Sequence, residues 1–515
     1  MGLIRFAVHP ASQLADWPEV QRGYLSGADG RIFPTRIEID GTIIGCRRSS
    51  SESSKFHVAW PVPGFGRLML QTASLPERDA PYLLAVELAR GKIVQLRNQS
   101  STWELAGMQL PAEFAPESAQ AHQIFAKAAS SQHEPERASA LAAEALVHAC
   151  RAANILGEAF ARQALAGRQQ RYAHLPTSLG CEVGPRFTSG PVANDEEGDL
   201  FYAAFNAATI PLRWTRIERE EGTYQWEAFD RQVEWAEHRR LIIRGGPLID
   251  LGPGGLPQWL AHWEHDFFNL QSFVCDFVET AIARYVGRIR WWEVATRFNS
   301  GGALTINEES RLGLVARVLE VAKQVDEEAQ LIVRVDQPWG EYQARGQHRL
   351  SPLQLVDALV RSGVGLAGVN LEIAVGYLPQ GSPYRDVLDF SRLIDMWSVL
   401  GVPLFVTLAH PSSLGADPNA TSDLHVDERA WPGECSEEGQ AAWVGRYLPV
   451  LLAKPTVAGV SWCHFSDADP HDFPHAGLLQ PDGAAKPALE RLLEFRPPAR
   501  SSWSSDHGIA PPRSG

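Results

Sequence analysis

The sequence predicts an α/β protein with a (β/α)8 barrel, preceded by a β-sandwich-like domain and an α-helical linker region. Residues 176–496 alternate eight β-branched or aromatic runs with eight helical stretches, which is the order of a barrel of this kind. Residues 1–110 consist of short strand-like runs between Gly, Pro and Ser turns, and residues 111–175 are rich in alanine. An open doubly wound sheet is the alternative, but the sequence has no GxGxxG or GxxxxGK[ST] phosphate loop, so we favour the barrel.

The first zone predicts a small β-sandwich. Its strand-like runs are RIFPTRIEID at 31–40, TIIGCRR at 42–48, FHVAWPV at 56–62, GRLMLQTASL at 66–75 and PYLLAVEL at 81–88. No helical period is apparent in these runs, and whether the zone binds a ligand stays open.

The second zone predicts a helical bridge between two domains. Pro116 can stand in the first turn of one helix, and a second helix is expected to start near Glu134. Small and apolar residues then recur every three or four positions, as one helical face requires. They are Leu141, Ala145, Ala149, Ala152, Leu156 and Ala159.

The third zone supplies the barrel. Its expected strands lie at 179–184, 209–214, 241–246, 289–295, 331–336, 366–373, 403–410 and 457–465. Its expected helices lie at 195–206, 226–240, 265–286, 308–326, 351–363, 386–400, 436–452 and 486–494. Functional groups of such a barrel are expected at the C-terminal ends of the strands. Residues 497–515 are expected to form a disordered tail.

Several motifs of the barrel zone occur in the order and at the spacing of a known family. They are Phe205-Asn206, Arg213-Trp214, Gly222-x-Tyr-x-Trp226, Asp230, Arg244-Gly245, LPQWL at 256–260, ARYVGRIRWWEV at 283–294, Gly477-Leu478-Leu479 and Lys486-Pro487-Ala488. In these motifs, residues from about 179 to 496 resemble glycoside hydrolase family 10, the endo-β-1,4-xylanase family. The resemblance implies a carbohydrate-active protein whose partner is a β-1,4-linked, xylan-like oligo- or polysaccharide. It implies no cofactor.

The resemblance also implies where the two catalytic glutamates should stand, and both are replaced. Retaining hydrolysis needs two carboxyl groups about 5–5.5 Å apart, one as acid/base and one as nucleophile. The acid/base position at the end of strand four corresponds to Arg297, and the nucleophile position on strand seven corresponds to Leu408. Arginine stays protonated in proteins, and leucine has no nucleophilic atom. Standard retaining hydrolysis is therefore not expected.

Two other carboxylates could substitute. Asp250 follows strand three and Glu372 lies near the end of strand six, so both are expected near the mouth of the barrel. Glu293 should lie about 13 Å deeper than Arg297, too far to reach the same substrate atom. Arg297 could clamp a carboxylate or phosphate of a ligand, or it could pair with Asp250 or Glu372 across an idle cleft.

Further residues are candidates for substrate binding. Trp214 and Trp462 could stack on sugar rings or fill the core, and His410 follows strand seven. His464 and Asp467 lie in the loop CHFSDADPHDFPHAG at 463–477, whose imidazole and carboxylate groups would suit a metal. The loop lacks a recognised ligand spacing, so we predict no metal site and regard it as a rim of the cleft.

Composition narrows the classes of function. The formal charge of −14 argues against a nucleic-acid binder, which needs a basic face. No membrane span is expected, because no uninterrupted apolar run is long enough. The six cysteines are scattered without a CxxC pair, and no secretory signal is apparent, which predicts a cytoplasmic location. The oligomeric state is not predicted.

Three hypotheses follow. The favoured one is a degenerate, xylanase-like protein that binds a glycan rather than cutting it. The second is a hydrolase or lyase of different chemistry that uses Asp250 and Glu372, with or without a metal. The third is a non-catalytic interaction scaffold.

Overall fold

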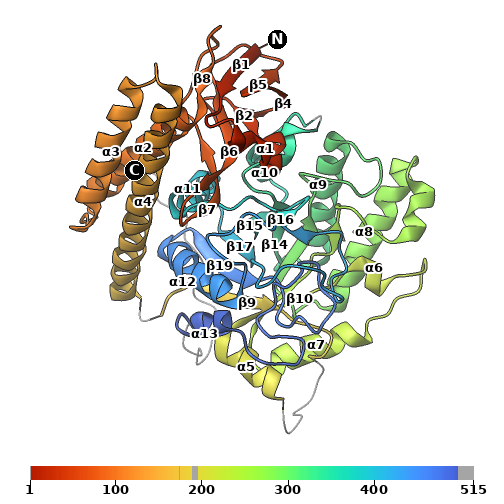
Figure 1. Cartoon of the computed structure of the whole chain (residues 1–515). Coiled ribbons are helices and arrows are strands. Elements are labelled where there is room, and N and C mark those ends of the chain that lie inside the picture. Colours follow the sequence, from red (N-terminus) through yellow and green to blue (C-terminus); the bar gives the residue numbers. More distant parts are fainter. Residues whose placement is uncertain (1, 173, 188–194, 347, 497–515) are drawn as a thin grey trace, which may run out of the picture.

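The computed structural model describes residues 2–172, 174–187, 195–346 and 348–496. It contains two N-terminal β-sheets, three long helices and a closed eight-stranded barrel (Figure 1). The predicted fold class is therefore confirmed. The tail predicted at 497–515 lies outside the described residues.

The N-terminal strands form two four-stranded sheets. One has the order β4-β5-β1-β8 and is built from β1 (Gly2–Ala7), β4 (Arg36–Asp40), β5 (Ile43–Arg48) and β8 (Tyr82–Leu83). The other has the order β3-β2-β6-β7 and is built from β2 (Tyr24–Ser26), β3 (Ile32–Phe33), β6 (Lys55–Val62) and β7 (Gly66–Gln71). Phe6 of the first sheet stacks on Phe56 of the second at 4.9 Å between ring centroids, so apolar side chains fill the space between the sheets. The short helices α1 (Ser12–Ala15) and η1 (Pro18–Arg22) lie between β1 and β2.

Three helices follow, one more than expected. They are α2 (Leu84–Leu105), α3 (Phe114–Ser130) and α4 (Pro135–Arg171). The strand-like interpretation of 81–88 was wrong beyond Leu83, and the β zone ends there rather than at 110. A short apolar run does not distinguish a buried strand from a buried helix, and the apolar side chains of α2 are buried through several turns.

The barrel closes because each strand pairs in parallel with two neighbours, and the last strand pairs with the first. Its strands are β9 (Ser178–Glu182), β10 (Ala207–Ile210), β11 (Ile242–Gly245), β13 (Trp291–Thr296), β14 (Gln330–Asp336), β15 (Leu366–Ala374), β17 (Leu404–Ala409) and β19 (Val457–Trp462). After a short break, β12 (Ile249–Asp250) continues the third strand along β13. Apolar residues predominate in these runs because parallel strands are buried on both faces, and the charged residues among them, such as Glu293 and Arg334, pair inside the barrel.

Helices alternate with these strands around the barrel. They are α5 (Glu196–Ala204), α7 (Glu227–His238), α8 (Phe267–Arg284), α9 (Glu308–Val325), α10 (Pro352–Arg361), α11 (Val387–Ser398), α12 (Glu437–Ala453) and α13 (Pro487–Leu493). Shorter elements in the connections are α6 (Trp214–Ile217), η2 (Gln258–Trp263), η3 (Glu341–Ala344) and the antiparallel pair of β16 (Tyr377–Leu378) with β18 (His425–Val426). Helix starts follow local chemistry, as in the capping box of Ser351 and Gln354 at α10.

Backbone hydrogen bonds and a buried ion pair hold the N-terminal part against the barrel. The backbone N–H of Met69 on β7 donates to the carbonyl of Tyr384 at 2.8 Å, and that of Arg67 donates to Ala430 at 3.1 Å. Both acceptors lie in connections that follow barrel strands, on the C-terminal face. Lys92 of α2 forms a buried ion pair with Asp386 at the start of α11. Helix α4 packs along α11 and α12 (Figure 1).

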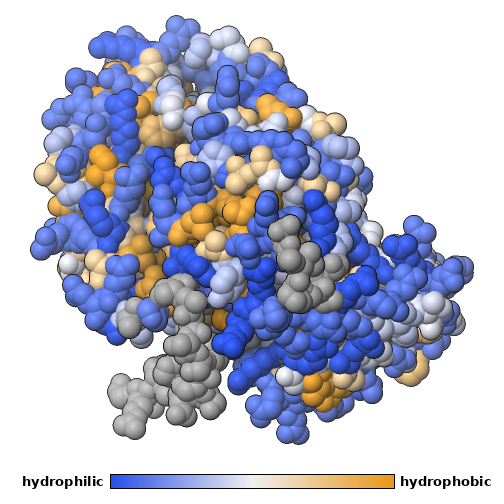
Figure 2. Space-filling model, turned by 90° about the horizontal axis from the view of Figure 1, so that it is seen from below, coloured by the Kyte–Doolittle hydropathy of each residue, from blue (hydrophilic) through white to orange (hydrophobic). Residues whose placement is uncertain are grey.

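The surface carries few large apolar side chains. Figure 2 shows a predominantly hydrophilic face with separate orange areas. Within the described ranges, no helix combines the length and apolar character needed to cross a bilayer.

Candidate functional site

A cavity of about 310 Å³ lies at the C-terminal ends of barrel strands, where sites of this fold are expected. Its walls include Glu182 at the end of β9, Asp250 of β12, Arg297 after β13, Arg334 of β14 and Asp472 from the loop after β19. We call it the mouth cavity. Charged side chains supply a large share of its lining, and most of them pair with other charged side chains.

Arg297 lies at the centre of this charge network. Its Nη1 donates to Asp250 Oδ2 at 3.0 Å, and its Nη2 lies 4.0 Å from Glu372 Oε1 and 3.9 Å from Asp472 Oδ2. The structure therefore brings together the predicted residues Asp250, Arg297 and Glu372. Burial opposes the charge of Arg297, but these carboxylates hold the pKa of its guanidinium above the ordinary arginine value.

The backbone of Arg297 has φ of 54°, in the left-handed region that side chains rarely occupy. Such strained residues cluster at binding and catalytic sites, because the surrounding contacts must hold them. Here the contacts with the three carboxylates supply that restraint.

A second arginine ties the mouth to the barrel interior. Arg334 Nε lies 2.6 Å from Glu293 Oε1, and its Nη1 donates to Glu372 Oε2 at 3.2 Å. Glu293 is fully buried and accepts a 2.6 Å hydrogen bond from Asn370. Glu293 therefore has a structural role deep in the barrel, as its distance along the strand predicts.

A third arginine spans the other side of the cavity. Arg213 Nη1 contacts both carboxylate oxygens of Asp472, at 2.8 and 2.9 Å, and its Nη2 lies 3.3 Å from Glu182 Oε1. Burial alone would raise the pKa of the Asp472 carboxyl, but Arg213 and Arg297 hold it below its usual range. Sequence reasoning assigned no site role to Arg213, Glu182 or Arg334, although each stands on or just after a barrel strand.

Asp336 is a further carboxyl that sequence reasoning missed. It ends β14, pairs in register with Glu372 on β15 and is 3% exposed. Ser300 Oγ donates to it at 2.8 Å. Burial and the neighbouring charge of Glu372 raise the pKa of Asp336 to about 6. A pKa near 6 suits proton exchange near neutral pH, and burial also raises the pKa of Glu182 on the other side of the network.

The predicted place of Leu408 needs correction. Thr407 Oγ1 bonds to Asn370 in the barrel interior, at 2.9 and 3.1 Å, so the next side chain of the strand points toward the helices. Leu408 is 1% exposed and lies in this outer layer. The inward position nearest the mouth is Ala409. No Asp or Glu occurs in β17, so the strand carries no carboxylate on either face.

Trp214 and Trp462 pack the fold instead of offering a face to a sugar. Trp214 lines the cavity but is 1% exposed, and its ring stacks on that of Phe277 at 4.7 Å between centroids. Trp462 is equally buried, and its indole N–H donates to the carbonyl of Ala476. Of the two alternatives left open for these residues, the structure supports core packing.

His410 is also a packing residue. Its ring lies 4.9 Å from the ring of Trp431 and 5.1 Å from that of Trp443, outside the barrel axis. Burial lowers its pKa to about 3, so it stays neutral. This packing favours a structural role for His410, and its predicted role in substrate binding stays a prediction.

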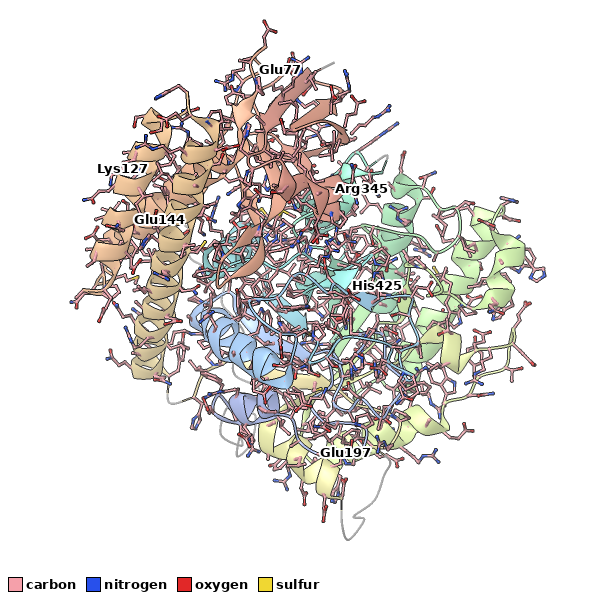
Figure 3. The ribbon with its side chains drawn as sticks, in the orientation of Figure 1. Glu77, Lys127, Glu144, Glu197, Arg345 and His425 are labelled. Carbon is pink, nitrogen blue, oxygen red and sulfur yellow. The ribbon has the colours of Figure 1, made fainter. Side chains whose placement is uncertain are left out.

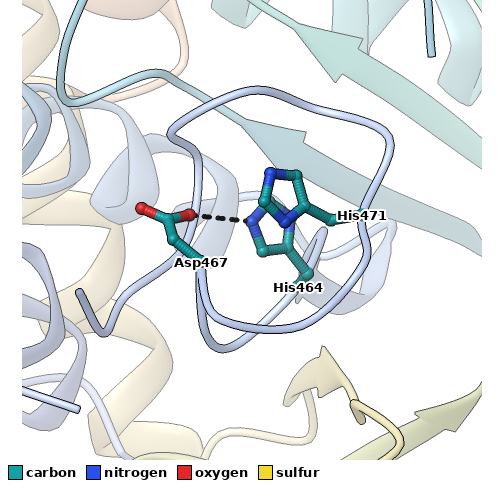
Figure 4. A group of neighbouring side chains, drawn as sticks. All are labelled: His464, Asp467 and His471. Carbon is teal, nitrogen blue, oxygen red and sulfur yellow. Dashed lines mark hydrogen bonds and ion pairs between the residues drawn. The ribbon is translucent and has the colours of Figure 1, made fainter. Parts of the chain in front are cut away.

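His464 and Asp467 lie in a separate cluster of the strand-eight loop (Figure 4). His464 Nε2 lies 3.1 Å from Asp467 Oδ1, and the His464 ring stacks on that of His471 at 4.1 Å. These three residues bring ligand atoms within 4.8 Å of one another, the spacing of a possible metal site. However, Lys486 forms a buried ion pair with Asp467, and both ring nitrogens of His471 face oxygen acceptors, Asp417 Oδ2 and the Asp469 carbonyl. The Lys486 cation and the hydrogen bonds already made by the imidazoles favour a hydrogen-bonded cluster over a metal site. The absence of a metal stays a prediction.

Comparisons with known proteins agree on one family for the barrel. Residues 176–376 match the family model described as Glycosyl hydrolase family 10. Endo-1,4-beta-xylanase B of Thermotoga neapolitana is 24% identical over 239 residues, 44% of this chain and 64% of that protein. Endo-1,4-beta-xylanase 3 of Hypocrea jecorina is 29% identical over 126 residues, 24% of this chain and 35% of that protein. The chain thus spans less than two thirds of the length of these relatives.

Solved structures with a similar barrel are also xylanases. Native xylanase 10B from Thermotoga maritima has a TM-score of 0.48 at 18% identity, covering 64% of this chain and 96% of its own. A GH10 endoxylanase from a sugarcane soil metagenome has a TM-score of 0.49 at 18% identity, and the match covers 62% of this chain and 98% of that structure's chain.

Proposed function

We propose that this protein, whose residues 176–376 match the Glycosyl hydrolase family 10 model, binds a β-1,4-linked, xylan-like glycan at the mouth of its barrel without retaining hydrolysis. The observation that carries the proposal is the surroundings of Arg297. This arginine occupies the end of strand four, where the family resemblance expects a proton-exchanging carboxyl. It is engaged with Asp250 and lies within 4.0 Å of Glu372.

The carboxylates at the mouth are not arranged as a donor and a nucleophile. A retaining site needs one protonated carboxyl and one free carboxylate about 5–5.5 Å apart. Asp250 and Glu372 both face the same guanidinium, and Asp472 is held ionised by Arg213 and Arg297. Strand β17 contributes no acidic residue. These features support binding without double displacement, and they weaken the alternative that uses Asp250 and Glu372 as an acid/base couple.

The same cavity supports recognition of a polar ligand. Guanidinium groups of Arg213 and Arg297 and the hydroxyl-bearing Thr421 and Ser422 line its walls. Hydroxyl-rich sugars are recognised by such convergent polar groups in a concave site. An inert scaffold would show no change in melting temperature with glycan, whereas a ligand at about 100 Kd should stabilise the fold by about 2.7 kcal/mol.

The test compares binding and cleavage in one set of variants. Wild-type protein is titrated with xylobiose and xylohexaose by calorimetry and assayed on xylan and on an aryl β-xylobioside. Saturable binding without turnover is expected. Arg297→Glu/Ala409→Glu returns carboxyls to strands four and seven. Arg317→Glu on the exposed face of α9 controls for the reversal of one arginine charge. Robust turnover by the wild type with retained configuration would overturn the proposal.

One observation favours a second candidate, hydrolysis by relocated carboxyls. Asp336 has a pKa of about 6 and stands in register with Glu372. In this case wild-type activity would fall as the pH rises through about 6, and Asp336→Asn would abolish it. Activity that is indifferent to Asp336→Asn would exclude this candidate.

A further inference from the structure

A second cavity, of about 370 Å³, lies where the N-terminal part meets the barrel. We call it the junction cavity. One wall consists of Ala59, Arg67 and Met69 from strands β6 and β7, and the opposite wall includes Ser300 and Gln337 of the barrel. Figure 3 shows the labelled Arg345, another lining residue, where the N-terminal sheets meet the barrel. The two parts of the chain therefore build this cavity jointly.

The junction cavity lies on the same face of the barrel as the mouth cavity. Its barrel residues follow strands four to seven, since Ser300 comes after β13, Gln337 after β14, residues 376–384 after β15 and Ala430 after β17. The mouth cavity lies over strands one to five, and the connections that follow strands seven and eight add Thr421, Ser422 and Asp472 to its lining. The two cavities thus occupy adjoining parts of one face.

Ser300 and Asp336 stand at the boundary between the cavities. Ser300 lines the junction cavity three residues after Arg297, which lines the mouth cavity. Its hydroxyl bonds to Asp336 at 2.8 Å, and Asp336 is paired in register with Glu372. Ser300 thus connects the lining of the junction cavity to the buried carboxyl of Asp336.

The charges of the junction cavity balance, which favours a neutral ligand. Arg22 pairs with Asp427 at 2.9 Å, and Arg67 pairs with Glu19. Glu341 pairs with Arg385 at 2.7 Å. Arg345 donates to a backbone carbonyl of η1. Three acidic and three basic side chains line the cavity, so it lacks the excess charge that would select an ion.

One buried hydroxyl in the wall lacks a partner. Ser382 is 2% exposed, and among the described residues its Oγ has no hydrogen-bond partner. Buried polar groups are nearly always paired, so each exception needs an explanation. A ligand hydroxyl in the cavity would supply the missing partner, because a serine hydroxyl both donates and accepts. Met69, Leu378 and Pro379 add apolar surface of the kind that packs on the C–H face of a sugar ring.

We infer that the junction cavity continues the glycan site and that the N-terminal sheet forms one wall of it. It holds additional neutral sugar residues of the same β-1,4-linked chain whose first residues occupy the mouth cavity. This inference rests on the proposed function and extends it, since it predicts preference for longer chains. It also gives the N-terminal domain a direct role in recognition.

The test uses two probes and two matched variants. Xylobiose and xylohexaose are titrated into the wild type, Ser382→Ala and Ser391→Ala by calorimetry. Ser391 of α11 is fully buried and also has an unpartnered hydroxyl within the described residues, but it lines neither cavity. Removing a hydroxyl that has no partner should leave the melting temperature of both variants unchanged.

The expected result is selective. The wild type binds xylohexaose more tightly than xylobiose, and Ser382→Ala lowers the affinity for xylohexaose about fivefold, the loss of one hydrogen bond. The affinity for xylobiose and both affinities of Ser391→Ala stay unchanged. Equal wild-type affinities, or an unchanged affinity of Ser382→Ala for xylohexaose, would overturn this inference alone. Failure of the wild type to bind either probe would overturn the proposed function with it.

Discussion

At the scale of single residues, the mouth of the barrel is organised by arginines. Arg213, Arg297 and Arg334 each contact two or more carboxylates, so the acidic groups that a hydrolase would use are held as ion-pair partners. The sequence alone indicated Arg297, Asp250 and Glu372, because all three stand near predicted strand ends. It could not indicate the Arg213–Asp472 pair, because those residues are 259 positions apart and meet only when the barrel closes.

The pairing of Arg297 with Asp250 predicts a coupling energy. Arg297→Gln leaves Asp250 without its cation. We expect a loss of about 2–3 kcal/mol in the free energy of unfolding, somewhat less than for a fully buried pair, because Asp250 keeps some solvent contact. In the double variant Arg297→Gln/Asp250→Asn the unpaired charge is gone, so part of the loss should be regained. Denaturant unfolding measures all four proteins of the cycle. Strictly additive losses would contradict a direct interaction.

The raised pKa of Asp336 predicts a pH dependence of stability. Because the folded-state pKa is about 6 and the ordinary value is 3.8, the folded protein favours the protonated form. This contribution is fully present below the ordinary value and is lost as the pH rises through about 6. Asp336→Asn cannot ionise and therefore does not lose stability as the pH rises. Its melting temperature should exceed that of the wild type above about pH 7 and approach the wild-type value near pH 4.

The matched control for this prediction is an exposed aspartate. Asp40→Asn on β4 should leave the pH profile of the melting temperature unchanged. A wild-type melting temperature above that of Asp336→Asn at neutral pH would contradict this prediction. It would show that hydrogen bonds stabilise the buried carboxylate more than the raised pKa of Asp336 indicates.

At the scale of elements, hydrophobic periodicity sufficed for the barrel. All eight predicted strands and eight predicted helices are present, with ends shifted by a few residues. Two assignments failed for the same reason. Short apolar runs concealed the first turn of the helix at 84–105 and the inward side of β17, where Thr407 rather than Leu408 faces the interior. An apolar run without alternating polar residues indicates neither whether it is a helix or a strand nor which side of a strand faces the barrel interior.

Two glycines of helix α4 differ in the space around them, so replacing each with alanine should change the free energy of unfolding in opposite directions. Alanine normally stabilises a helix by up to about 1 kcal/mol relative to glycine. Gly167 has open space around its Cβ position, so Gly167→Ala should show this gain. A Cβ at Gly157 would lie 2.5 Å from Val387 Cγ1 of α11, so Gly157→Ala should destabilise by about 1–3 kcal/mol. Denaturant unfolding of both variants measures the difference, and equal gains would contradict the tight packing of α4 on the barrel.

At the scale of the whole molecule, the N-terminal sheets and the barrel enclose one cavity between them. Strand β7 bonds through its backbone to barrel connections, and the junction cavity lies between the two parts. The domain limits predicted at 110 and 175 came from composition, whereas the structure ends the β zone at Leu83. The shared cavity could not be predicted from the sequence, because its walls come from distant segments that only the docked fold brings together.

The most direct test of the central claim is a calorimetric titration of the wild type with xylohexaose, followed by product analysis. We predict a saturable heat of binding that returns to baseline, with the hexaose recovered intact. A steady heat of turnover, with shorter oligosaccharides released in the β configuration, would contradict the claim that Arg297 and an acid-free seventh strand leave the barrel able to bind but not to cleave by retention.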